Sequence, residues 1–154
     1  MDCSHIYFCE EKSKVNLIAL RDLFDLAAFW AKDRKIEDLE IAIAHSNPVI
    51  TIWDNSLMIG FARATSDGIY RATIWDVMLH PHYRGLGLGR RLVETMLNHP
   101  SIHRVERVYL MTTHQQKFYE RIGFVDNSST TMVFSNGLSI INNYAFNLDS
   151  LPVN

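Results

Sequence analysis

Apolar residues recur at spacings of three and four between positions 15 and 31, which is the period of an amphipathic helix. Phe29 and Trp30 widen the apolar face near the end of this segment. A second helix is expected over about 36–45, because Asn47-Pro48 disfavours further helical turns. The chain is therefore expected to place two helices before its central strands.

Shorter apolar or alternating stretches, bounded by turn residues, predict strands. Asp54-Asn55 and Asp67-Gly68 are the expected turns of two consecutive hairpins. Strands are expected at 5–10, 49–53, 57–64, 69–79 and 105–111, with strand-like pieces in 130–148, and later helices at 87–98 and 114–121. One strand–helix–strand crossover is expected to be right-handed and parallel. These elements predict a mixed α/β fold, and the lack of repeats and linkers predicts one domain over 1–154.

Composition narrows the class of protein. Of the 154 residues, 47% are hydrophobic and 21% are charged, as in a folded soluble domain rather than a disordered, fibrous or disulfide-scaffold chain. No window approaches the roughly 18 uninterrupted apolar residues of a membrane span, and residues 1–11 resemble neither a signal nor a transit peptide. A cytosol-like compartment without membrane contact is expected, where Cys3 and Cys9 stay reduced.

The charge distribution favours a small anionic ligand. The net charge of −2 argues against a nucleic-acid-binding surface. Residues 80–110, however, hold five basic residues against two acidic ones. The basic ones are Arg84, Arg90, Arg91, Arg104 and Arg107.

The sharpest local motif is the glycine-rich turn 84–90, which lies between a predicted strand and a predicted helix. Gly85, Gly87 and Gly89 remove the Cβ atoms that would block close approach to the backbone. The unpaired N–H groups at the start of the following helix form an anion site, for which pyrophosphate is a usual ligand. Arg84 and Arg90 can add charge-assisted hydrogen bonds. The alternative interpretation is a tight connection without a ligand.

Two nucleotide-binding motifs and a metal site do not fit these residues. A P-loop requires a lysine after its last glycine, and a dinucleotide fingerprint requires G-x-G-x-x-G rather than the G-x-G-x-G present here. His80 and His82 have the spacing of metal ligands, but no third ligand is evident and Pro81 favours an ordinary turn. No metal is expected.

Two ordered motifs resemble the GCN5-related N-acetyltransferase (GNAT) family. Residues 77–89 contain its R/Q-x-x-G-x-G/A pattern at Arg84, Gly87 and Gly89, and residues 118–124 match its F/L-Y-E-x-x-G-F pattern. The resemblance covers about residues 5–135, whereas 137–154 match no known pattern. It implies a central, mostly antiparallel mixed sheet with one parallel, splayed strand pair, flanked by helices.

Further segments resemble the plastid and cyanobacterial branch of that family, which includes plant-type serotonin N-acetyltransferases and plastid acetyltransferases of proteins. These segments are 28–31, 38–44, 60–76 and 109–116. The resemblance implies acetyl transfer from acetyl-CoA to a primary amine, an arylalkylamine such as serotonin or tryptamine, in a cyanobacterial cytoplasm or plastid stroma. Acetylation of protein lysines or N-termini, a non-catalytic acyl-CoA-binding module, and a homodimer stay open.

The resemblance also assigns the cofactor site. The pantetheine arm is expected along the first strand of the splayed pair, and the pyrophosphate over the glycine loop. The residues implied are Val77, Met78, Leu79, Arg84, Gly85, Leu86, Gly87, Leu88, Gly89 and Arg90. Tyr119 takes the position of the family's usual proton donor to the departing thiolate, although a tyrosine there can also simply pack its ring.

The general base is not where the family usually carries it. Thr73, Trp75 and Met111 occupy the positions of the familiar bases, and Thr112 replaces a frequent asparagine. Asp76 remains, as an acid within an apolar strand that needs a partner, and a substrate ammonium can serve as that partner. Asp76 is the candidate base, and Trp75 is a candidate to stack on an aromatic acceptor. In a regular strand their side chains point to opposite faces, so both serve one substrate only if a bulge or the splay re-aims one.

Overall fold

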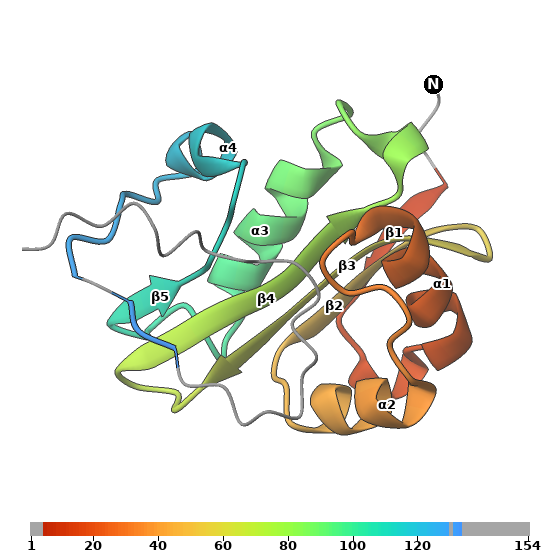
Figure 1. Ribbon diagram of the computed structural model, residues 1–154, viewed down its shortest axis with the longest axis horizontal. Helices are drawn as coiled ribbons and strands as arrows, with labels where there is room; N and C mark the ends of the chain where they lie inside the picture. The colour runs from red at the N-terminus through yellow and green to blue at the C-terminus, as the bar shows by residue number, and fades with distance from the viewer. Residues whose placement is uncertain (1–4, 130, 134–154) are drawn as a thin grey trace, which may run out of the picture. The chain divides into compact units, whose positions relative to one another are not determined.

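The central sheet contains five strands in sequential order. The computed structural model describes residues 5–129 and 131–133, and Figure 1 shows the sheet at its centre. The strands are β1 (Ile6–Cys9), β2 (Val49–Asp54), β3 (Leu57–Ser66), β4 (Arg71–Leu79) and β5 (Arg107–Tyr109). The first three neighbouring pairs are antiparallel, whereas β4 and β5 are parallel. The expected mixed, mostly antiparallel sheet is confirmed.

Helices cover both faces of this sheet (Figure 1). On one face, α1 (Leu17–Ala27) and α2 (Ile36–Ala44) bury their apolar sides with Phe61 and Met78 of the sheet. On the other face, α3 (Leu88–Asn98) packs against a second core that includes residues from β2, β3 and β4. The short elements are η1 (Lys12–Lys14), η2 (Pro81–Tyr83) and α4 (Gln116–Glu120). The crossover through α3 joins β4 to β5, so the glycine loop lies at the end of β4.

The first helix is shorter than its apolar period suggests. It begins after Asn16, whose side chain accepts hydrogen bonds from two main-chain N–H groups, and it ends at Ala27 rather than near 31. The following loop is closed by the Asp33 N–H, which donates to Asp25 Oδ1 at 3.1 Å. Phe29 and Trp30, expected on the buried face, lie instead in this loop with 61% and 45% of their surface exposed.

The end of the chain is described only in part. Two units divide it, 1–124 and 125–154, and all the elements above belong to the first. Residues 125–129 and 131–133 adopt neither helix nor strand, and the rest of the strand-like pieces expected in 130–148 lie outside the described residues. Cys9 carries a free thiol, whereas Cys3 lies outside the described part of the chain. No helix found within 5–129 combines the length and apolar character needed to cross a membrane.

Candidate active site

The site is organised by the separation of β4 from β5. Their parallel pairing includes only Arg71↔Arg107, Ala72↔Val108 and Thr73↔Tyr109, so β5 is shorter than the strand expected at 105–111. Beyond Thr73, β4 has no partner on this side among the described residues, and Figure 1 shows the chain after β5 leading away towards α4. The splay that the family resemblance implies is therefore present.

At the last three residues of β4, only main-chain groups face the open edge where a ligand can bind. The Val77 and Leu79 side chains pack on the α3 side, and Met78 packs into the core beneath α1 and α2. The other edge of β4 is occupied, because Leu79 and Met78 are in register with Gly60 and Phe61 of β3. An amide-bearing arm such as pantetheine fits the unpaired edge as an added strand would.

The glycines of the loop have two different roles. Gly85 and Gly87 have φ angles of +82° and +77°, and a Cβ built on either would meet nothing within 4 Å. They are required for a left-handed backbone that faces open space. Gly89 lies inside α3, where a Cβ would be 3.2 Å from Leu79 Cδ1 and 3.5 Å from Phe118 Cζ. Gly89 therefore permits close packing of α3 against β4 and α4.

The start of α3 is suited to an anion. Gly87 is its N-cap and supplies no side-chain hydrogen bond, so the first N–H groups of the helix remain directed at the loop. Leu88 is buried in the core, whereas Leu86 and Arg84 are exposed. Arg90 is exposed and its Nε donates to Glu94 Oε1 at 2.7 Å. The open glycine cradle and the helix end fit the pyrophosphate of acetyl-CoA.

Tyr119 is held in α4 by aromatic neighbours. Its ring makes edge contacts with Phe118 and Phe124, at centroid distances of 4.9 Å and 5.7 Å. Burial raises the pKa of the Tyr119 phenol to about 12. The hydroxyl makes no hydrogen bond to any residue that the structure describes. At neutral pH it is a protonated donor without an internal acceptor.

A bulge in β4 brings Trp75 and Asp76 to the same face of the sheet. Phe61 pairs with Met78 and Arg63 pairs with Trp75, so two residues of β4 oppose one of β3. Asp76 is the residue with positive φ at this bulge, at +54°, a conformation that aspartate tolerates better than most side chains. Its side chain consequently points to the face covered by α1 and α2, beside that of Trp75.

Asp76 finds its partner within the chain. Arg63 Nε donates to Asp76 Oδ2 at 2.7 Å, and Arg34 Nη1 lies 3.7 Å from the same oxygen. The Asp76 side chain is only 7% exposed, which explains why it needs a countercharge. A second hydrogen bond, from Arg63 Nη1 to Ser46 Oγ at 3.2 Å, fixes this guanidinium.

The sequence interpretation missed both arginines. Arg63 is the only basic residue in β3, and an arginine within an otherwise buried strand signals a buried acid nearby. Arg34 lies in the loop before α2, and nothing in the sequence links it to Asp76.

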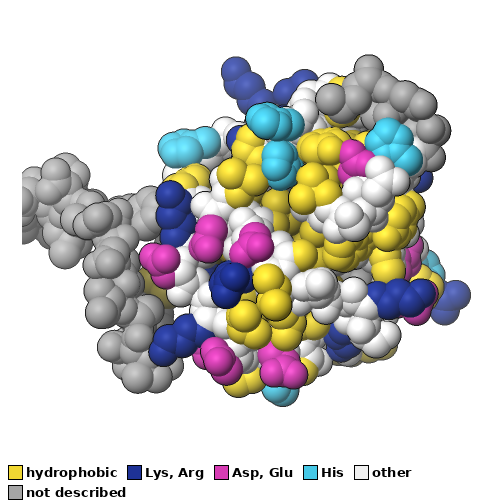
Figure 2. All heavy atoms as spheres, turned by 90° about the vertical axis from the view of Figure 1, so that its right-hand side faces the viewer, with side chains coloured by type: hydrophobic (Ala, Val, Ile, Leu, Met, Phe, Trp, Pro, Cys, Tyr) yellow, Lys and Arg dark blue, Asp and Glu magenta, His cyan; other side chains and the backbone are white. Residues whose placement is uncertain are grey.

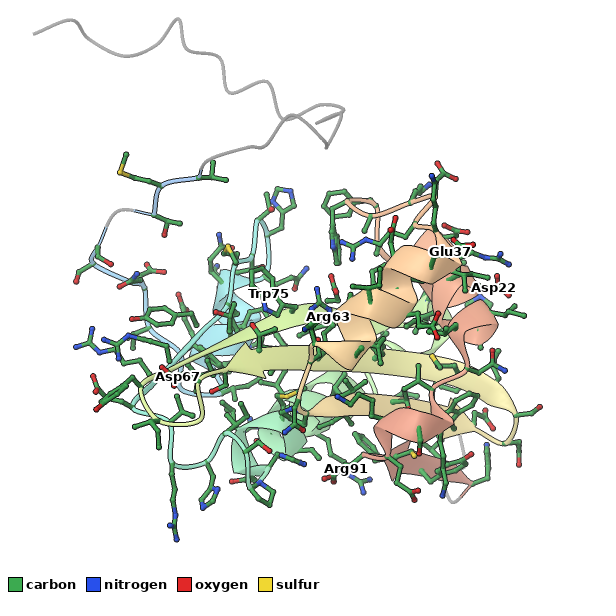
Figure 3. All side chains as sticks on the ribbon, turned by 90° about the horizontal axis from the view of Figure 1, so that it is seen from below. Asp22, Glu37, Arg63, Asp67, Trp75 and Arg91 are labelled. Carbon is green, nitrogen blue, oxygen red and sulfur yellow. The ribbon has the colours of Figure 1, made fainter. Side chains whose placement is uncertain are left out.

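Trp75 is fixed rather than mobile. Its Nε1 donates to Thr65 Oγ1 at 2.9 Å, and the Arg63 guanidinium carbon lies 5.9 Å from the ring centroid. Figure 3 shows Arg63 and Trp75 beside each other on the face of the sheet that carries α2. The indole is partly exposed, so the wall of the site next to Asp76 is aromatic.

The remaining candidates shape turns. His80 Nδ1 accepts from the His82 N–H at 3.3 Å at the start of η2, and burial, with His82 nearby, lowers the pKa of His80. Thr112 Oγ1 accepts from the Gln115 N–H at 3.1 Å just before α4.

Within the part of the chain that the structure describes, no three His, Cys, Asp or Glu side chains gather as metal ligands would. On the face that carries α1, charges of both signs are interspersed (Figure 2).

Comparison with known proteins agrees with this geometry. An uncharacterized N-acetyltransferase named ycf52, from Pyropia yezoensis, is 34% identical over 125 residues, which are 78% of this chain and 70% of the relative. A chloroplastic GCN5-related N-acetyltransferase 1 from Arabidopsis thaliana is 28% identical over 73% of this chain and 58% of its own length.

A solved structure has the same fold. This acetyltransferase from Xanthomonas campestris, described as belonging to the GNAT family, has a TM-score of 0.75 and 27% identity, covering 87% of this chain and 96% of its own. The family model for the acetyltransferase (GNAT) domain matches residues 45–126, which include the splayed strands, the glycine loop and Tyr119. This chain belongs to the GNAT family and is an N-acetyltransferase that uses acetyl-CoA.

Proposed function

We propose that the enzyme transfers the acetyl group of acetyl-CoA to the primary amine of an arylalkylamine such as serotonin or tryptamine. The observation that supports this acceptor best is the bulge in β4. It places an acid, Asp76, and an aromatic wall, Trp75, on one face where β4 leaves β5. The acetyl end of a pantetheine arm that follows the open edge of β4 lies beside them.

The acceptor must lose a proton before it attacks. An alkyl ammonium has a pKa of about 10, so most of the free substrate is protonated at neutral pH. Asp76 Oδ1 makes no hydrogen bond to any described residue and is not fully buried, so it is accessible to a ligand. It can accept a hydrogen bond from the ammonium and pass the proton to water.

The neutral nitrogen then attacks the thioester carbon. As the N–C bond forms and the C–S bond breaks, negative charge develops on the carbonyl oxygen and then on sulfur. The Tyr119 hydroxyl is protonated and supplies a hydrogen bond to the departing thiolate. One proton of the ammonium leaves by way of Asp76 and water before the attack. Tyr119 gives its proton to the departing thiolate and is reprotonated by the second proton, which leaves the nitrogen as the amide forms, so the products are the amide, the coenzyme A thiol and one proton.

A protein amine is the second candidate acceptor. The exposed pair Phe29 and Trp30 lies in the loop that also carries Arg34, with ring centroids 5.1 Å apart. Two exposed aromatic rings in the same loop as Arg34 can bind side chains that flank a target lysine. The Arabidopsis relative is named as chloroplastic and another relative comes from Prochlorococcus marinus, which supports a plastid stroma or a cyanobacterial cytoplasm as the location.

The test is amine kinetics on Asp76→Asn between pH 6 and 9, following free thiol with acetyl-CoA and either tryptamine or a lysine peptide. The substitution keeps the shape and removes the charge, so kcat/KM for the amine should fall about tenfold or more while the Kd for acetyl-CoA stays within about twofold. Asp22→Asn, on the exposed surface of α1, is the matched control. A pH profile that overlays that of the wild type would assign Asp76 a structural role only. The absence of thiol release with both amines would overturn both proposed acceptors.

A further inference from the structure

The charges around the bulge do not balance. One carboxylate, Asp76, faces two guanidinium groups, those of Arg63 and Arg34. Arg63 is the nearer of the two, since its Nε donates to Asp76 at 2.7 Å and its Nη1 to Ser46 at 3.2 Å, and it is only 15% exposed. This one pair already neutralises Asp76, and among the described residues Arg34 has no second carboxylate within 4 Å.

Arg34 has unused donors that solvent reaches. Its approach to Asp76 is 3.7 Å, which is longer than the roughly 2.7–2.9 Å of a charge-assisted hydrogen bond. It makes no hydrogen bond to any other residue that the structure describes, and 34% of its side chain is exposed. Its planar fork of N–H groups is therefore available to a ligand in the site.

Arg34 is nevertheless held in place. Its guanidinium carbon lies 4.8 Å from the centroid of the Phe24 ring, and Phe24 is buried in the core. The loop before it is closed by the bond from the Asp33 N–H to Asp25 Oδ1. A guanidinium fixed in this way loses little conformational entropy when it binds a carboxylate.

We infer that the acceptor carries a carboxylate beside its amine, as an aromatic α-amino acid does, and that Arg34 binds this carboxylate. The inference rests on the proposed function: it keeps acetyl transfer to the amine of an arylalkylamine and adds a carboxylate, which serotonin and tryptamine lack. The ammonium of the acceptor binds Asp76 Oδ1, its carboxylate binds Arg34, and its aromatic ring packs against Trp75. Arg34 Nη1 lies 3.7 Å from Asp76 Oδ2, so the two charged groups are neighbours, as the ammonium and carboxylate of an α-amino acid are. A phosphate dianion fits less well, because its second charge would face Asp76.

The test compares tryptophan with tryptamine, which share the indole ethylamine and differ only in the carboxylate. In the wild type, kcat/KM is expected to be higher for tryptophan. In Arg34→Gln the ratio of kcat/KM for tryptophan over tryptamine should fall roughly ten- to a hundredfold, mainly through KM, and Arg34→Lys should restore part of it. Lys32→Gln removes a charge from an exposed position of the same loop and should keep the wild-type ratio.

Calorimetry on the coenzyme A complex separates this inference from the proposed function. Binding of tryptophan that weakens in Arg34→Gln but not in Lys32→Gln supports the inference even if neither indole is acetylated. Acetylation of tryptamine with a ratio that Arg34→Gln leaves unchanged overturns the inference and keeps the proposed function. Failure of tryptophan to bind to the wild-type complex also overturns the inference.

Discussion

At Asp76 one backbone torsion decides which side chains face the acceptor. With φ at +54°, the bulge directs Asp76 to the side of Trp75, whereas a regular strand would turn it into the apolar core beneath α3. The cost of burying the carboxylate is then offset by Arg63. Position 76 thus combines a conformation that few residues tolerate with a charge that only this face can compensate.

Tyr119 offers the clearest single-atom prediction. Tyr119→Phe removes the hydroxyl and keeps the ring contacts with Phe118 and Phe124, so folding and acetyl-CoA affinity should be retained. We expect kcat to fall about ten- to a thousandfold, because the thiolate loses its hydrogen-bond donor. Steady-state kinetics measures this, and Tyr70→Phe, at an exposed tyrosine, is the control. Wild-type kcat in Tyr119→Phe would mean that water or another group supports the thiolate.

Because the pKa of Tyr119 is raised, its ionisation does not contribute to the pH profile of that reaction near neutral pH. The phenol loses its proton only around pH 12, so it remains a donor throughout pH 6 to 9. Any change of rate within that range must come from another group, such as the acceptor amine. The change of rate between pH 6 and 9 therefore reports on the loss of the amine proton and not on Tyr119.

At the scale of elements, the glycine loop allows a matched comparison. Gly87 and Gly68 have φ angles of +77° and +80°, and at both positions a Cβ would meet open space. Gly87→Ala and Gly68→Ala should each destabilise the fold by about 1–2 kcal/mol through the left-handed backbone. Only Gly87→Ala is expected to weaken acetyl-CoA binding, by about tenfold or more in calorimetry, because its methyl group occupies the space of the pyrophosphate. Equal affinities in the two variants would contradict this placement of the cofactor.

A hydrogen bond to the β2–β3 hairpin stabilises the start of the glycine loop. Asp54, at the end of β2, accepts from the Tyr83 hydroxyl and lies 3.1 Å from His5 Nε2. Tyr83 is the last residue of η2, next to Arg84, so this carboxylate fixes the entry to the loop. Asp54→Asn should raise the KM for acetyl-CoA about two- to tenfold with kcat nearly unchanged. Ser56→Ala, in the same hairpin turn, is the control, and a change confined to kcat would argue against this stabilisation.

Periodicity predicted the elements around this loop well, because strand and helix patterns are local. The strand before the loop, the helix after it and the parallel crossover all followed from short-range signals. The end of α1 did not, since hydrogen bonding between Asp33 and Asp25 overrides the continuing apolar period. The partners of Asp76 were also hidden, because Arg63 lies 13 positions away and the bulge that aims Asp76 at it breaks the alternation on which strand patterns depend.

At the scale of the whole molecule, acetyl-CoA is expected to join parts of the fold that strand pairing does not connect. One side consists of β4 and the glycine loop, and the other of the segment that follows β5 into α4. The strands are paired over only three residues, so a ligand in the splay supplies the missing contacts on both sides. A ligand at a hundred times its Kd would stabilise the folded state by about 2.7 kcal/mol.

Hydrogen exchange can locate this effect. Saturating acetyl-CoA should slow amide exchange in Val77–Leu79, in the loop 85–90 and in α4 together, because the arm, the pyrophosphate and the thioester each contact one of these segments. Exchange in α1, which contributes no residue to the expected cofactor site, should change little and serves as the internal reference. Protection limited to 85–90 would place the cofactor on the loop but outside the splay. In that case the acetyl group would not reach Asp76, and the acceptor site at the bulge would have to be abandoned.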